Sequence, residues 1–289
     1  MTTGATPGSL ILVSGKGGVG KSAVAAGLAL SAHRQGSRVL AIDVTGAGGL
    51  SAHLGGGRLD FKTREVRPGL FALTIDRTKA LAEYVKVQIG VPQFATMGPV
   101  ARAFDALAST APGVREVITL GKVLWEVQHG GYDLVVADCP PTGAITGLLR
   151  APTTIAELVP AGRVRHQAEW MSTLLSRDES ELVMVTLAEE LPTVETQETL
   201  ALLAAETLVK PPTIVTNRVL PRLETDAKGT GIAAEAAILH RSLYRNQQEW
   251  IRRLPPDRRL PYLFGLLTPG EVAARLADAW DQSGEKSGA

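Results

Sequence analysis

The stretch LILVSGKGGVGKS, residues 10–22, decides how this chain folds. It begins with the apolar run 10–13 and continues into 15–22, where four of the eight residues are glycine. This loop fits the spacing G-x-x-x-x-G-K-[ST], and the segment after it, 21–35, has the pattern of a helix. Glycines let backbone N–H groups turn inward around phosphate oxygens, and a helix N-terminus favours negative charge. The sequence therefore predicts a nucleotide-binding site built from a strand, a phosphate loop (residues 15–22) and a helix.

Two side chains of the phosphate loop have the chemistry that ATP requires. We expect Lys21 to reach the β- and γ-phosphates and to act in catalysis, and Ser22 to ligate Mg²⁺ through its hydroxyl. The apolar strand 132–138 ends in Asp138, whose carboxylate is a second expected Mg²⁺ ligand, directly or through water. The Pro-Pro-Thr-Gly segment that follows, 140–143, is typical of a switch loop that moves between nucleotide states. The expected ATP-binding residues of this region are Gly15, Gly17, Gly18, Val19, Gly20, Lys21, Ser22 and Ala23.

Short apolar runs alternate with longer helical patterns along the rest of the chain. Alternation of this kind predicts a parallel sheet that is covered on both faces. We therefore expect an α/β fold, a doubly wound and mostly parallel sheet of the P-loop NTPase kind, with ATP at the C-terminal ends of the strands. The predicted strands are 10–14, 38–43, 70–75, 132–138, 182–187, 212–216 and 260–264.

The whole chain, 1–289, is expected to form a single ATPase domain with a helical subdomain inserted in it. Two stretches, 77–130 and 155–176, are longer than a normal crossover and have mostly helical patterns. Together they predict the subdomain, and the tail 282–289 is expected to be disordered. The helical stretch 162–175 has an apolar face that would suit a client groove, although such a face more often packs on the protein's own core.

Composition argues against several classes of protein. The 30 basic and 29 acidic residues nearly balance, so the composition does not indicate a nucleic-acid partner. No run of about 18 apolar residues occurs, which argues against stable membrane insertion. The start of the chain, 1–9, does not have the pattern of a secretory signal. We expect a cytoplasmic protein.

Lys16 is a second lysine in the phosphate loop, although one lysine is enough to hold a phosphate. The form K-G-G-V-G-K-[ST] resembles the deviant Walker A motif of the arsenite-pump ATPases, the guided-entry ATPases for tail-anchored proteins, the Min and Par ATPases and the nitrogenase iron proteins. In these relatives the first lysine crosses a dimer interface to the phosphates of the other subunit. The resemblance therefore implies that Lys16 is catalytic in a homodimer, or in a heterodimer with a related ATPase. A cation supplied in this way neutralises charge that develops between phosphates.

Three further segments resemble the arsenite-pump and guided-entry branch in particular. DCPPTG (138–143) is similar to its D-x-A-P-T-G-H signature, and VTLAEELPTVET (185–196) and TNRVLP (216–221) extend the similarity. In relatives the Asn of N-R-V-L-P reads the adenine edge, so the resemblance implies that Asn217, with its neighbour Arg218, binds the nucleotide. A side-chain amide donates and accepts at once, which suits adenine.

The sequence departs from the family pattern in three places. The relatives carry an aspartate that orients the attacking water, and here that position aligns with Ala52 or with Thr45. Asp43 is the nearest carboxylate and is our candidate for a catalytic role. Because the family aspartate is absent, we expect either slow hydrolysis or a different group that positions the water. The His of the signature is Ala144 in this chain. Cys139 is the only cysteine, so the thiolates needed for arsenite capture, a zinc-bridged dimer or an iron–sulfur cluster are absent.

Three functions are open from the sequence. The leading hypothesis is a dimeric Mg·ATP-binding ATPase whose nucleotide state gates its conformation and the binding of an apolar client or partner protein. The second is a nucleotide-sensing scaffold or regulatory subunit that hydrolyses ATP weakly and pairs with a related ATPase. The third is a positioning ATPase of the Par or Min type.

Overall fold

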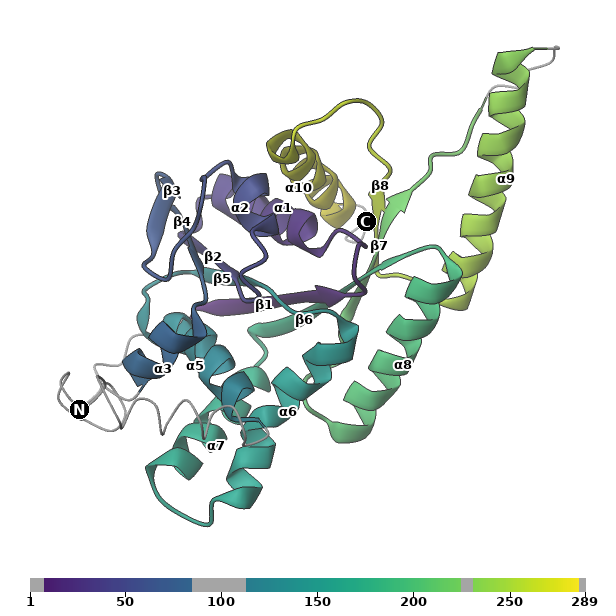
Figure 1. The fold of residues 1–289 in the computed structure, drawn as a ribbon. Helices are drawn as coiled ribbons and strands as arrows, with labels where there is room; N and C mark the ends of the chain where they lie inside the picture. Colours follow the sequence, from purple (N-terminus) through teal and green to yellow (C-terminus); the bar gives the residue numbers. More distant parts are fainter. Residues whose placement is uncertain (1–7, 85–112, 225–230, 286–289) are drawn as a thin grey trace.

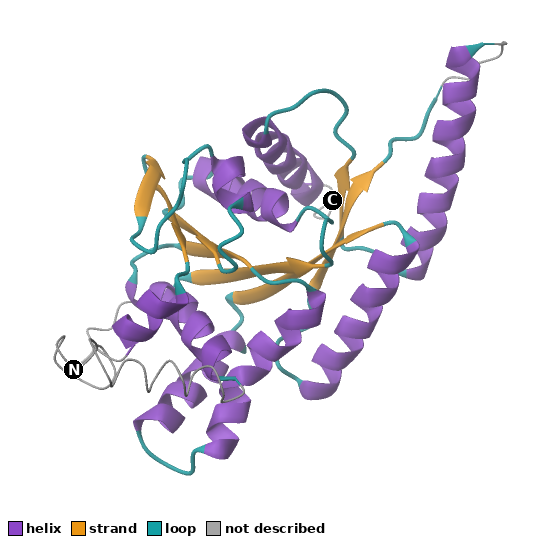
Figure 2. Ribbon diagram, in the orientation of Figure 1, coloured by secondary structure: helices purple, strands orange, loops and turns teal. Residues whose placement is uncertain are grey.

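An eight-stranded sheet crosses the middle of the molecule, and helices cover both of its faces (Figure 1, Figure 2). The computed structural model describes residues 8–84, 113–224 and 231–285. The strand order is β3-β4-β2-β5-β1-β6-β7-β8, and within these ranges only the edge pair β3–β4 is antiparallel. The predicted α/β fold with a doubly wound, mostly parallel sheet is thereby confirmed. The strands are β1 Ser9–Gly15, β2 Val39–Asp43, β3 Arg64–Arg67, β4 Leu70–Thr74, β5 Leu134–Asp138, β6 Ser180–Leu187, β7 Thr213–Val219 and β8 Arg258–Pro261.

The parallel register brings the C-terminal ends of the central strands to one edge. β1 lies between β5 and β6, with Val13 opposite Asp138 and Gly15 opposite Val185. β2 pairs with the other side of β5, so Asp43 lies opposite Asp138. The phosphate loop and both of these aspartates therefore leave the sheet at the same edge, which is where open α/β sheets bind ligands.

Each face of the sheet has its own apolar core. Alternate residues of a strand point to opposite faces, so Leu12 packs with α5, α6 and α7 while Val13 packs with α1 and α10. The central strands, such as β2 and β5, are buried on both faces, which explains why they are nearly continuous apolar runs. The helices are α1 Lys21–Arg34, α2 Gly49–Leu54, α3 Arg77–Tyr84, α5 Val114–His129, α6 Thr142–Leu158, α7 Arg163–Leu175, α8 Glu190–Glu206, α9 Ile232–Arg253 and α10 Pro269–Glu285.

Two features at the edges of the sheet differ from the sequence prediction. The strand β3 was not predicted because its residues, Arg-Glu-Val-Arg, are charged and mostly exposed and form no apolar run. It is held by pairing with β4 across a tight turn, where Gly69 has a φ of 83°. The strand predicted at 260–264 ends early, at Pro261, because its partner β7 has an irregular register after Thr216 and Arg218 has a φ of 56°.

The helices α5, α6 and α7 pack against one another below the sheet (Figure 1). α5 and α7 fall within the stretches predicted to form a helical subdomain, whereas α6 lies mostly outside them, and 85–112 lies outside the described residues. The boundaries of the subdomain remain a prediction. On α7, the apolar face is turned to the core rather than to solvent. Its residues Ala168, Met171, Leu174 and Leu175 are buried, and only Val164 is exposed.

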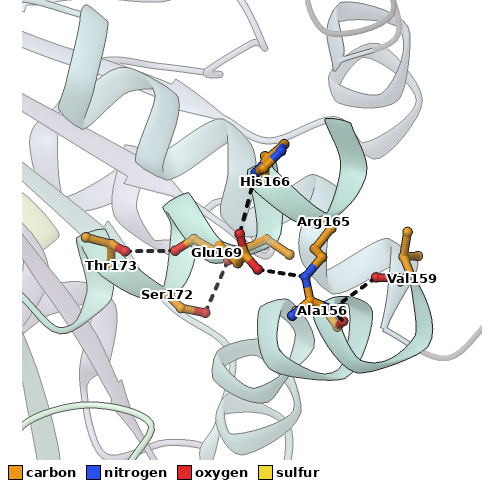
Figure 3. A network of polar contacts seen from close by, with 8 residues as sticks. Ala156, Val159, Arg165, His166, Glu169, Ser172 and Thr173 are labelled. Carbon is orange, nitrogen blue, oxygen red and sulfur yellow. Dashed lines mark hydrogen bonds and ion pairs between the residues drawn. The ribbon is translucent and has the colours of Figure 1, made fainter. Parts of the chain in front are cut away.

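A polar network fixes the turn between α6 and α7 (Figure 3). The Arg165 guanidinium donates to the backbone oxygens of Ala156 and Val159, at 2.8 and 3.4 Å. The last carbonyls of a helix have no partner within the helix, so Arg165 satisfies two of them for α6. Glu169 in turn accepts from Arg165 at 2.7 Å and lies 3.6 Å from the ring of His166. The C-terminal end of α6 is therefore attached to α7.

The C-terminal helix α10 lies along α1 and continues through Glu285. The expected disordered tail, 282–289, is thus helical over its first part, and 286–289 lie outside the described residues. Asp281 explains the extension, because its carboxylate accepts from Ser31 and Gln35 of α1 and attaches the last turns to the body. None of the helices in the described ranges has the length and apolarity needed to cross a bilayer.

Candidate nucleotide-binding site

The phosphate loop joins β1 to α1, and two of its glycines are required by the backbone. Gly15 has a φ of 148°, and a Cβ there would lie 2.0 Å from the backbone oxygen of Val185. Gly20 has a φ of 98°, and a Cβ there would lie 2.5 Å from the Asn217 amide nitrogen. Any other residue at either position would be strained and would also clash. The conformation of the phosphate loop therefore depends on glycine at positions 15 and 20.

A cavity of about 460 Å³ opens beside the phosphate loop. This volume is within the usual range for a small-molecule site. Lys21 and Ser22 line it from the start of α1, while Asn217 and Arg218 line it from β7. The predicted residues in its lining are Gly18, Gly20, Lys21, Ser22, Ala23, Asn217 and Arg218, whereas Gly15, Gly17 and Val19 belong to the loop but not to the lining.

Asn217 connects β7 to the phosphate loop. It is buried, and its amide nitrogen donates to the backbone oxygen of Val19 at 2.9 Å. Its side-chain oxygen accepts from the backbone N–H of Arg218, also at 2.9 Å. The amide carries a second N–H and its oxygen a second lone pair, so each can still contact a ligand in the cavity. The contact of Asn217 with a nucleotide remains a prediction.

Sequence analysis did not assign three parts of the lining. Pro261 ends β8, Tyr262 and Leu263 follow it, and His53 comes from α2. Val272 and Leu276 of α10 close the apolar side. The residues at the end of β8 could have been predicted from the sequence. A strand that is parallel to its neighbour β7 must end at the edge of the sheet where ligands bind. The α10 contribution depends on how that helix packs, which a pattern of apolar residues does not specify.

The two lysines of the phosphate loop have different partners. The Lys21 ammonium lines the cavity and donates to the backbone oxygen of Lys16 at 3.1 Å. Burial lowers the pKa of Lys21, and the nearby Asp138 opposes this shift. Lys16 is not part of the cavity lining, and its ammonium forms an ion pair with Glu195 of α8. Lys21 thus faces the cavity of its own chain, whereas Lys16 is paired outside it, and the phosphate contacts of both remain predictions.

Ser22 and Asp138, the two expected Mg²⁺ ligands, contact each other. The Ser22 hydroxyl donates to the Asp138 carboxylate, which is buried at the end of β5. Burial raises the pKa of Asp138 to about 6, and the neighbouring Asp43 adds to the rise while Ser22 and Lys21 oppose it. A cation here would reverse that penalty, and hydroxyl and carboxylate oxygens are donors that Mg²⁺ prefers. The residues present therefore fit a magnesium ion.

Asp43, the candidate for a catalytic role, uses both carboxylate oxygens to shape the loop after β2. One oxygen accepts from the backbone N–H groups of Thr45 and Gly46 and from the Thr45 hydroxyl, at 2.8–3.1 Å. The other accepts from the N–H of Gly48 at 2.9 Å. The loop leads directly to Gly49, where an added Cβ would lie 2.6 Å from the Ser22 hydroxyl oxygen. Asp43 therefore holds this loop against the expected Mg²⁺ site, and its role toward water remains a prediction.

Cys139 follows Asp138 and is buried in the core. Burial raises the pKa of its thiol, so it is a poor candidate for a thiolate ligand. Over 8–84, 113–224 and 231–285, no group of three or more His, Cys, Asp or Glu side chains could hold a metal ion. A magnesium site with one serine and one aspartate requires no such group, because phosphates and waters supply its other ligands.

Comparison with known proteins identifies the family of the chain. The family described as anion-transporting ATPase matches residues 9–177. A protein named ATPase BagA from Mycobacterium tuberculosis is 33% identical over 74% of this chain. ATPase ARSA2 from Chlamydomonas reinhardtii is 33% identical and ATPase get3 from Schizosaccharomyces pombe 31% identical, each over 50% of this chain. The matched region covers 66%, 38% and 44% of these three proteins, respectively, so each is longer than the part that it shares.

Proposed function

The chain belongs to the anion-transporting ATPase family, and on this premise we propose that it is a Mg·ATP-dependent ATPase that works as a dimer. The observation that carries the proposal is the cavity beside the phosphate loop, where Lys21, Ser22 and Asn217 converge from α1 and β7. The apolar residues after β8 and on α10 give the same cavity a wall that suits a base, while the loop end suits phosphates.

Each residue has a definite part in this mechanism. The phosphate loop orients the triphosphate with its backbone N–H groups, and Lys21 neutralises charge on the transferred phosphoryl group. Ser22 and Asp138 would hold Mg²⁺, which when bound supplies a Lewis acid that draws charge from the phosphate oxygens. Asp138 must lose its proton to do so, and with a pKa of about 6 it does at neutral pH.

We assign Lys16 to the phosphates of a second chain. It lies on the phosphate loop but outside the cavity lining of its own chain. A cation supplied across an interface stabilises the transition state only when two chains have closed around ATP. This makes hydrolysis conditional on assembly, whether the second chain is another copy or a related ATPase.

Nucleotide state reaches the helical region through α6. This helix begins at Thr142, within the switch loop 140–143 that follows Asp138, and ends at Leu158, where Arg165 attaches it to α7. Ser14 also ties the end of β1 to the switch loop, because its hydroxyl donates to the Pro140 oxygen at 2.6 Å. Movement of the switch loop would therefore tilt α6 and shift α7. An apolar client or partner protein is the expected load, and the cytoplasm remains the expected location.

The test combines oligomer size with hydrolysis. We expect the chain to be monomeric without nucleotide and dimeric, by light scattering, with Mg²⁺ and a non-hydrolysable ATP analogue. Lys21→Ala should lose ATP binding, whereas Lys16→Ala should keep ATP binding but lose dimer formation and turnover. Lys62→Ala, an exposed lysine outside the cavity, is the control and should behave as wild type. A chain that binds ATP and stays monomeric, alone and with related ATPases, would refute the dimer.

A second function is favoured by the contacts of Asp43. Four hydrogen bonds already occupy its carboxylate, and Ala52 and Thr45 offer no carboxylate in its place. The chain would then be a regulatory subunit that binds ATP, hydrolyses it weakly and pairs with a more active relative. Turnover near the uncatalysed rate with intact ATP-dependent assembly would select this function over the first.

A further inference from the structure

We propose that Glu195 is a latch: it holds Lys16 within its own chain until the triphosphate of a second chain takes that lysine away. The inference rests on the proposed function, because it assigns a regulator to the same lysine. Glu195 is not in the cavity lining, and it acts on the reaction only by positioning Lys16.

The two oxygens of the Glu195 carboxylate contact two different elements. One oxygen forms the ion pair with the Lys16 ammonium of the phosphate loop. The other accepts from the Thr142 hydroxyl, at 3.3 Å, and Thr142 is the first residue of α6. Thr199, one turn further along α8, donates to the Glu195 backbone oxygen at 2.7 Å. A single carboxylate thus connects the phosphate loop to the switch loop through the rigid helix α8.

The exposure of the ion pair suits reversible exchange. The Lys16 side chain is 27% exposed and the Glu195 side chain 38% exposed. Water can therefore reach the pair and solvate either partner when it separates. A partly exposed ion pair of this kind favours the paired over the separated state by only about two- to fivefold. A triphosphate bears several negative charges where Glu195 bears one, so a nucleotide-bound second chain competes for the lysine successfully.

The latch makes assembly depend on ATP. The Lys16 ammonium cannot contact a phosphate across an interface while it is paired with Glu195. A second chain without nucleotide offers no phosphate to compete, so Lys16 stays with Glu195. When ATP draws Lys16 across, the Glu195 carboxylate loses its cation and interacts with Thr142 alone. Docking of a second chain therefore changes the contact between Glu195 and the switch loop.

The test uses Glu195→Gln, which keeps the shape of the side chain and removes its charge. The control is Glu198→Gln, because Glu198 is an exposed carboxylate on the same helix. With Mg²⁺ and a non-hydrolysable ATP analogue, two latches open per dimer. The dimer dissociation constant of Glu195→Gln should therefore fall about four- to twenty-five-fold, and that of the control should not change. Dimer should also appear at lower nucleotide concentrations, with the affinity of the monomer for ATP unchanged.

A second measurement reports on the latch without any dimer. In the nucleotide-free chain, the rate at which an amine-reactive acetylating reagent modifies Lys16 is followed by mass spectrometry of its peptide. Glu195→Gln should raise this rate about two- to fivefold, and Glu198→Gln should leave it unchanged. Thr142→Val should leave Lys16 paired and therefore leave its acetylation rate unchanged.

The outcomes separate the latch from the proposed function. If wild type dimerises with ATP and Lys16→Ala does not, but Glu195→Gln matches wild type in both assays, the function stands and the latch is wrong. If Glu195→Gln weakens the dimer, Glu195 supports Lys16 across the interface and the latch is again wrong. If neither wild type nor Glu195→Gln dimerises, the proposed dimer and the latch are both wrong. Faster acetylation of Lys16 in Glu195→Gln would then show only that the ion pair exists.

Discussion

Replacing Asp138 by Asn should stabilise the nucleotide-free protein while it damages the site. Asp138 is 4% exposed at the end of β5, and burial is the main reason for its raised pKa of about 6. Asn has nearly the same shape, and its side-chain oxygen can still accept from Ser22. The substitution therefore removes a buried charge and keeps the hydrogen bond that this charge accepts.

The size and sign of the effect follow from linkage. The folded-state pKa of about 6 lies above the value of 3.8 for the free group, so the folded chain holds the proton more tightly than the unfolded chain. A difference of about two pKa units corresponds to about 3 kcal/mol. This penalty is fully present above about pH 6 and disappears as the pH falls towards about 4. Asn carries no such penalty at any pH.

Urea unfolding at several pH values measures the difference directly. Without nucleotide at about pH 8, Asp138→Asn should raise the free energy of unfolding by about 1–3 kcal/mol, and near pH 4 the two proteins should agree. With saturating Mg·ATP, wild type should become more stable than Asp138→Asn, because only the carboxylate holds the cation. Glu198→Gln is the control and should show neither effect. A destabilised Asp138→Asn, or a gain that does not depend on pH, would refute this reasoning.

Three other substitutions test separate parts of the structure. Gly20→Ala should abolish ATP binding in isothermal titration and lower stability, because its Cβ would meet Asn217 at 2.5 Å and its φ is 98°. Tyr262→Ala should weaken ATP about three- to tenfold without changing the urea midpoint of the nucleotide-free chain, because Tyr262 lines the cavity and is 43% exposed. Met171→Ala should lower the free energy of unfolding by about 2–5 kcal/mol, because it empties a buried site on α7. ATP affinity per folded molecule should not change in this last variant, and a change would show that α7 is coupled to the site without a partner.

The parts of the fold that the sequence predicts are those in which a local pattern and a global constraint agree. β1, the phosphate loop and α1 follow from apolar residues, glycines and the lysine at fixed spacing. The position of Asp138 is predicted equally well. A carboxylate that ends an apolar strand lies at the C-terminal edge of a parallel sheet, beside the end of β1. β3 was missed because its charged residues are stabilised only by pairing with β4, a contact that its own sequence does not encode.

The parts of the site that were missed depend on packing between distant segments. Glu195 lies 179 positions from Lys16, and no spacing rule relates α8 to the phosphate loop. Tyr262 could have been anticipated as a residue that follows a parallel strand, but the early end of β8 at Pro261 results from the irregular register of β7. His53 and Leu276 reach the cavity because α2 and α10 both pack on α1.

The contacts of Asp43 bear on which of the two functions holds. Its carboxylate is fully engaged by the loop that leads to Gly49 beside Ser22, so it can orient water only if this loop opens. Asp138 opposite it must be ionised to hold a cation, and the neighbouring charge of Asp43 adds to the rise in the pKa of Asp138. A bound cation would relieve this repulsion and would let Asp43 exchange backbone partners for water. Hydrolysis through Asp43 would therefore be seen only after Mg·ATP and the second chain have rearranged this loop. Asp43→Asn that abolishes turnover but preserves ATP-dependent assembly would support the enzyme, whereas a variant that loses both would assign Asp43 to the architecture of the loop.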